Sequence, residues 1–103
     1  MEIKKITGDS FRTEVTEAGL PVMAVFCRED DDLCKAQIPI LEEAAKEACD
    51  VRFCLVNVDD DPSLASRFEI TVLPTMLILN GEKIFRKITG YCSLEYILDV
   101  LEM

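Results

Sequence analysis

The fold is decided by one stretch of sequence, VMAVFCREDDDLCKAQIP, which occupies residues 22–39. Its first six residues are all apolar, a pattern typical of a strand that is covered on both faces. An acidic run follows at residues 29–32, and behind it apolar and small residues recur at helical spacing as far as Ala48. Pro39 lies inside this segment and predicts a kink. The stretch therefore indicates a buried strand, an acidic loop and a long helix.

The rest of the chain alternates between strand and helix patterns. Strand patterns occupy residues 3–6, 51–58, 76–79 and 83–88, and the Asn-Gly pair at residues 80–81 predicts a hairpin turn between the last two. Helices are predicted after three cap positions: Asp9 or Ser10, Asp61 with proline next to it, and Ser93. The resulting order is βαβαβαββα. Because helix-connected strands are parallel and the hairpin is antiparallel, we predict one α/β domain over residues 1–103, with a central mixed sheet flanked by helices on both faces.

Composition excludes several classes of function. The chain has 103 residues, 11 Lys and Arg against 20 Asp and Glu, a net charge of -9, and no histidine or tryptophan. Without histidine there is no imidazole base and no His-containing zinc site. The acidic balance argues against nucleic acid and anionic membrane surfaces as partners. Residues 22–27 are too few to span a bilayer and residues 1–7 lack the apolar core of a secretory leader, so we expect a cytoplasmic protein.

Five cysteines are present, and reducing conditions in the cytoplasm keep such thiols free unless redox chemistry is their purpose. An odd number cannot pair completely within one chain. There is no C-x-x-C motif, and the acidic run at residues 59–61 lacks the glycine and glutamate that an EF-hand loop would need at positions 64 and 70. We expect no metal and no cofactor. Cys49 and Cys54 are expected to pack in the core.

Four short motifs carry a resemblance to a known family. They are Cys34-Lys35-Ala36-Gln37-Ile38-Pro39, Asn57-Val58-Asp59, Phe68-Glu69-Ile70-Thr71-Val72-Leu73-Pro74-Thr75, and Asn80-Gly81-Glu82 followed by Gly90. At these spacings the chain resembles the thioredoxin family over essentially its whole length. The resemblance implies a thioredoxin-like fold, in which Cys34 matches the second active-site cysteine and Pro74 the cis-proline that faces the active-site sulfurs. The backbone of Leu73 would then be able to pair with a bound peptide as an added strand.

The departures from the family fall on the active-site loop. Asp31 stands where the family has its attacking cysteine, and Asp30 stands where it has a tryptophan. Asp32 and Leu33 replace the Gly-Pro between the two cysteines, and Cys27 replaces an aromatic residue upstream. A carboxylate cannot attack a disulfide to form a mixed disulfide. The usual dithiol mechanism is therefore not available through Asp31.

A second departure concerns proton transfer. The resemblance places the buried acid of the family's second strand at Val25 and the lysine paired with it at Leu55. The helix dipole favours a Cys34 thiolate by about 0.3 to 1 kcal/mol, but several nearby carboxylates oppose it. We therefore expect no strongly lowered thiol pKa, and Cys34 could equally be a structural thiol. For Asp31 we favour an N-cap role, in which its carboxylate accepts the amide of Cys34, over an acid or base role.

Cys27 is the best available partner for Cys34 because both lie near the active-site end. They could form a disulfide if the intervening loop folds back, but burial as two thiols is favoured. Cys92 is a second candidate partner.

Three functions remain open. The first is a divergent thioredoxin-like protein that carries out thiol-disulfide exchange through Cys34 and Cys27. The second is a redox-inactive module that binds a protein or peptide through the Leu73-Pro74 groove and an acidic rim, and the third is a monothiol capped by glutathione or a similar thiol. The expected partner is a protein or peptide, basic or disulfide-bearing, and we expect a monomer.

Overall fold

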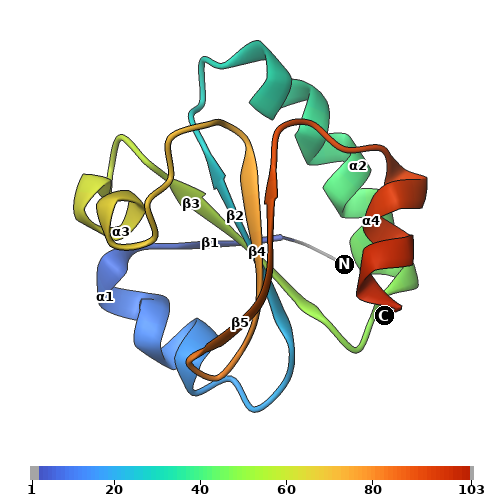
Figure 1. The fold of residues 1–103 in the computed structure, drawn as a ribbon, viewed down its shortest axis with the longest axis horizontal. Helices are drawn as coiled ribbons and strands as arrows, with labels where there is room; N and C mark the ends of the chain where they lie inside the picture. The colour runs from blue at the N-terminus through green and yellow to red at the C-terminus, as the bar shows by residue number, and fades with distance from the viewer. Residues whose placement is uncertain (1–2, 103) are drawn as a thin grey trace.

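The structure, a computed structural model, describes residues 3–102 (Figure 1). Its elements follow the predicted order βαβαβαββα, with one π-helix, η1, continuing the first helix. They are β1 (Lys4–Ile6), α1 (Gly8–Phe11), η1 (Arg12–Thr16), β2 (Val22–Cys27), α2 (Asp32–Glu47), β3 (Arg52–Asn57), α3 (Pro62–Arg67), β4 (Thr75–Asn80), β5 (Lys83–Thr89) and α4 (Leu94–Leu101).

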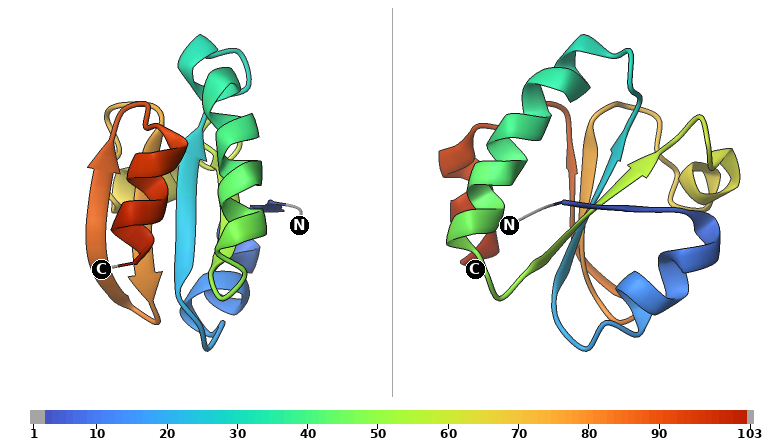
Figure 2. Two further views of the ribbon diagram at one scale, coloured as in Figure 1. Left: turned by 90° about the vertical axis from the view of Figure 1, so that its right-hand side faces the viewer. Right: turned by 180° about the vertical axis from the view of Figure 1, so that it is seen from behind.

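The five strands form one mixed sheet in the order β1-β3-β2-β4-β5. The strands β1, β3 and β2 are parallel, whereas β4 and β5 are antiparallel to their neighbours. Figures 1 and 2 show α1 and α3 on one face of the sheet and α2 and α4 on the other. The predicted α/β architecture, a mixed sheet flanked by helices on both faces, is confirmed. Within residues 3–102, no helix is long and apolar enough to cross a membrane.

Strand β2 lies at the centre and divides the core into two clusters. All six of its side chains are buried. Because successive side chains of a strand point to opposite faces, Met23, Val25 and Cys27 pack towards α2 and α4, and the other three pack towards α1 and α3. This alternation places the Cys27 side chain on the face that α2 covers.

The predicted cap at Asp9 or Ser10 is wrong, whereas the predicted N-cap position of Asp61, with proline after it, is confirmed. The first helix begins at Gly8 after Thr7, because the Ser10 hydroxyl accepts the amide of Thr7 at 3.0 Å and closes the first turn earlier. Asp61 does occupy the N-cap position of α3 but makes no cap hydrogen bond. Its carboxylate instead accepts the amide of Gly8, so it ties the start of α3 to α1 across the sheet edge.

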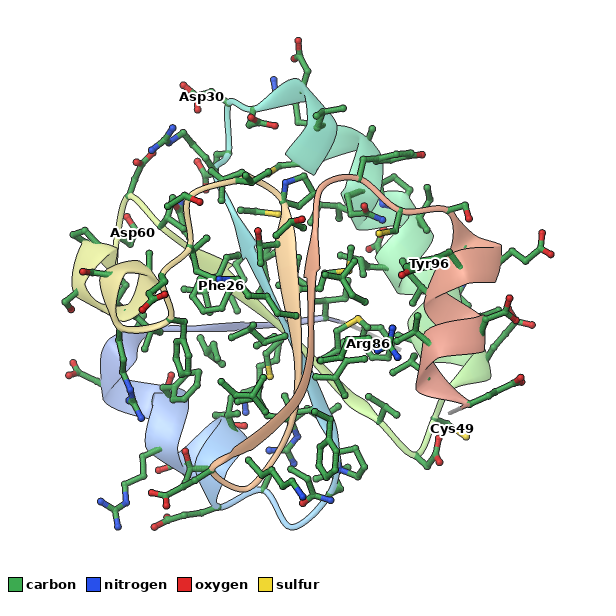
Figure 3. The ribbon with its side chains drawn as sticks, viewed as in Figure 1. Phe26, Asp30, Cys49, Asp60, Arg86 and Tyr96 are labelled. Carbon is green, nitrogen blue, oxygen red and sulfur yellow. The ribbon has the colours of Figure 1, made fainter. Side chains whose placement is uncertain are left out.

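The two cysteines expected in the core behave differently. Cys54 is fully buried in the centre of β3, as predicted. Cys49 is exposed, so the core prediction for it is wrong. The reason is that α2 ends at Glu47 with Ala48 as its C-cap, and the helical spacing used for the prediction no longer applies one residue later. Figure 3 shows Cys49 beyond the end of α2, away from the sheet.

Candidate functional site

Cys27 and Cys34 meet where β2 ends and α2 begins. Cys27 is the last residue of β2 and Cys34 is the third residue of α2. Asp31 is the N-cap of α2, and its Oδ1 accepts the amide of Cys34 at 3.0 Å, which confirms the predicted capping role. The cap fixes the first turn of the helix, and this turn holds the Cys34 side chain against the end of β2.

The two thiols lie in one buried cluster, and each affects the ionisation of the other. The Cys34 sulfur accepts the amide of Arg28 at 3.4 Å and also interacts with the Cys27 thiol. Both residues are free thiols, with relative exposures of 5% for Cys27 and 2% for Cys34. The favoured sequence interpretation, burial of both as thiols, is therefore confirmed. Cys92 is not part of this pair, because its own thiol approaches the carbonyl of Gly90 at 3.5 Å.

Neither thiol is activated by its surroundings. Burial raises the pKa of Cys27 far above its usual value, and the hydrogen bond and charge of Cys34 raise it further. Burial also raises the pKa of Cys34, and the Asp31 carboxylate acts in the same direction. The hydrogen bonds from Arg28 and Cys27 oppose this rise in the pKa of Cys34. The expectation of no lowered thiol pKa is confirmed, and Cys34 is the better stabilised of the two as a thiolate.

Exposed carboxylates lie in the loops that follow β2 and β3 and at the start of α2. We call them the acidic rim; its members are Glu29, Asp30, Asp32, Asp59 and Asp60. Two of them, Asp30 and Asp60, are labelled in Figure 3. Only Asp59 pairs with a cation in the described part of the chain, through Arg28 Nε at 3.0 Å. Leu33, which follows Asp32 in the first turn of α2, is 52% exposed.

The Leu73-Pro74 bond lies at the same end and is cis. Pro74 is buried and its carbonyl accepts the amide of Gly90 at 2.8 Å, whereas Leu73 is half-buried against the cluster that contains both cysteines. Neither the amide nor the carbonyl of Leu73 has a hydrogen-bond partner within residues 3–102. The backbone of Leu73 is thus available to an incoming chain.

Sequence reasoning missed Gln37 as a positioning residue. It is fully buried in α2, where its Nε2 donates to the carbonyl of Cys92 at 2.9 Å and its Oε1 accepts the amide of Cys92 at 2.7 Å. The two bonds fasten α2 to the loop that follows Gly90. The available signal was a polar residue at a core position of the helix, because buried amides are almost always hydrogen-bonded.

Two cavities flank the site. One, of about 400 Å³, is lined by both Cys27 and Cys34 and lies between α2, β1 and β3. The other, of about 690 Å³, is lined by Leu73 and Arg28 but by neither cysteine. No three His, Cys, Asp or Glu residues of the described chain are grouped so that they could hold a metal ion.

A five-stranded mixed sheet with this helix arrangement, a cis-proline loop and a cysteine in the first turn of α2 defines a thioredoxin-like protein. The crystal structure of a chloroplastic thioredoxin z agrees in fold, with a TM-score of 0.88 over 99% of this chain and 93% of that chain at 21% identity. The thioredoxin family model matches residues 2–103. A thioredoxin of Rickettsia prowazekii is 41% identical over 83 residues, 79% of each chain, and one of Acidithiobacillus ferridurans is 35% identical over 80 residues, 77% of this chain and 74% of the other.

The chain therefore belongs to the thioredoxin family, whose general chemistry is thiol-disulfide exchange.

Proposed function

We propose that this protein carries out thiol-disulfide exchange through Cys34, with Cys27 in place of the family's missing first cysteine. The observation that supports the proposal is that the two thiols, drawn from β2 and α2, are buried in the same cluster and line the same cavity. Cys34 is the attacking group because its sulfur accepts the amide of Arg28, a hydrogen bond that favours the thiolate. Cys27 then closes the disulfide with Cys34. We expect this chemistry to take place in the cytoplasm.

The test is oxidation with diamide followed by intact-mass measurement and peptide mapping. We expect the protein to lose two hydrogens and the bridge to map to Cys27 and Cys34. Cys34→Ser should abolish this bridge, whereas Cys49→Ser, a matched change at the exposed cysteine, should leave it intact. Five free thiols after oxidation of the wild-type protein would contradict the proposal.

The groove at Leu73 and Pro74 favours a second function. The backbone amide and carbonyl of Leu73 are unpaired. Val72, which precedes Leu73, and Tyr91, which follows Gly90, are each 46% exposed. We propose as the alternative a redox-inactive module that binds a basic peptide or protein through this groove and the acidic rim. Cys34→Ser should then leave binding of a basic peptide library unchanged, and Pro74→Ala should weaken it. The reverse pattern would reject the module.

A further inference from the structure

The route to the two thiols lies on the side of the sheet covered by α2. The cavity of about 400 Å³ that both cysteines line is here called the thiol cavity. Neither Leu73 nor Pro74 lines it, and the cavity that Leu73 does line contains no cysteine. The elements that border the thiol cavity, α2, β1 and β3, face the viewer in the right-hand view of Figure 2. A molecule that uses this cavity thus reaches the sulfurs without passing through the cavity that Leu73 lines.

The walls of the thiol cavity combine an apolar interior with charges of both signs. Three aliphatic residues line it: Ile6, Ile38 and Leu55. Lys5 and Lys35 supply positive charge, and Glu29 and Asp60 supply negative charge. Lys5 lies on the cavity face because it is the register partner of Leu55. Among residues 3–102 neither lysine forms an ion pair, so both are available to a ligand carboxylate.

The size of the cavity and the burial of the sulfurs limit what can enter. Small-molecule pockets have volumes of about 300–1,000 Å³, and the thiol cavity lies within this range. With 2% of Cys34 and 5% of Cys27 exposed, a disulfide inside a folded protein is hindered more strongly than a small free disulfide. A slender disulfide with charged ends suits the cavity better, because Lys5 and Lys35 are placed to meet a carboxylate and Glu29 and Asp60 to meet an ammonium group.

We propose that the thiol cavity binds a low-molecular-weight disulfide of an amino-acid or short-peptide thiol, and that such a disulfide is the substrate of the Cys34 and Cys27 pair. The substrate is thus smaller than the protein or peptide partner expected from the sequence. This inference rests on the proposed exchange function and adds its substrate class.

The reaction balances without any further reagent. Cys34 loses its proton to solvent, and its thiolate attacks one sulfur of the small disulfide, so that a Cys34 mixed disulfide forms and the first small thiolate leaves and takes up a proton. Cys27 then loses its proton and attacks the Cys34 sulfur, which expels the second small thiolate. One small disulfide is reduced to two thiols while the two cysteines are oxidised to one disulfide. A dithiol such as dithiothreitol restores the protein.

The test compares two probes on the reduced full-length protein: oxidised glutathione, which carries both charges, and the neutral 2-hydroxyethyl disulfide. The readout is the rate at which the Cys27-Cys34 disulfide appears by mass spectrometry. Leu55→Phe narrows the cavity. It should slow the oxidation of the cysteine pair by both probes at least about tenfold, because small misplacements at a reacting centre have large effects. Ile84→Phe, an equal enlargement on exposed β5, should slow neither.

Charge is tested at an exposed position that does not threaten folding. At low salt Lys5→Glu should slow the oxidation of the cysteine pair by oxidised glutathione at least about threefold and leave its oxidation by the neutral probe unchanged. Added salt should reduce the difference between the two rates. Lys83→Glu on β5 makes the same charge change away from the cavity and should affect neither probe.

Three results would overturn the inference: unchanged rates in Leu55→Phe, equal effects of Lys5→Glu on both probes, or faster oxidation of the pair by insulin than by oxidised glutathione. If diamide itself forms no Cys27-Cys34 bridge, the proposed exchange function fails. If diamide forms the bridge and the cavity variants behave as wild type, only the substrate assignment fails.

Discussion

Replacement of Gln37 by methionine should destabilise the protein far more than its conservative shape suggests. The change keeps the length of the side chain but removes both hydrogen bonds to the backbone of Cys92. Because Gln37 is fully buried, water cannot replace them. Each orphaned buried group costs about 1–3 kcal/mol, and methionine regains part of this by apolar burial, so we expect a net loss of about 2–4 kcal/mol.

Urea denaturation followed by circular dichroism measures this loss. A domain of this size should also melt roughly 8–32 °C lower, at about 4–8 °C for each kcal/mol. Cys92→Ala is the matched control, since it keeps the backbone groups that Gln37 binds and should cost no more than about 1 kcal/mol. A loss below about 1 kcal/mol for Gln37→Met, or a larger loss for Cys92→Ala, would refute the argument that the paired amide holds α2 to the loop.

Three further predictions concern the cap and the other thiols. Asp31→Ala should lower the free energy of unfolding by about 1 kcal/mol, because it removes the cap. Asp31→Asn keeps a hydrogen-bond acceptor and should change the free energy of unfolding little. Equal melting temperatures for the two variants would contradict the capping role. Burial raises the pKa of Cys54 from 9.0 to about 11, so the unfolded chain loses this proton first and stability falls as pH rises between these values. Relative to Cys54→Ala, the wild type should therefore lose about 2–3 kcal/mol over that interval in urea titrations, and parallel curves would count against it. Exposed Cys49 should be alkylated by iodoacetamide before the four buried cysteines, and mass mapping that finds another cysteine labelled first would disprove this.

The fold could be predicted because its signals are local and repeated. The apolar run of β2, the hairpin at Asn80-Gly81 and the cap at Ser93 each specify an element through backbone geometry alone, and the order of elements then limits the topology. Ser93 accepts the amide of Tyr96 as a cap residue should. The start of the first helix was missed because Thr7, Asp9 and Ser10 are all competent near a cap, and only the folded turn selects among them.

The candidate site could be predicted in part. The Asp31 cap and the burial of Cys27 and Cys34 follow from residue type and position. The meeting of the two thiols in one cluster depends on where the β2-α2 loop returns the chain, which no local pattern specifies. The thiol cavity was not predicted, because its walls combine β1, the β2-α2 region and β3, which are separated in sequence. Gln37 carried a visible signal, a polar residue on an apolar helix face, but its partner is a backbone 55 residues away.

The alternation along β2 has a consequence for how such a site can arise and change. Cys27 meets Cys34 only because its position has the right parity on the strand; a cysteine at residue 26 would face α1 and α3. A single-residue insertion or deletion within β2 would turn the side chains beyond it to the opposite face of the sheet. The Cys27 and Cys34 sulfurs would then be separated, and the other buried side chains of the strand would be misplaced in the same way. A single point substitution on this face of β2 is therefore enough to create or remove such a thiol pair, whereas a change in the length of the loop at residues 28–31 leaves the strand's contribution intact.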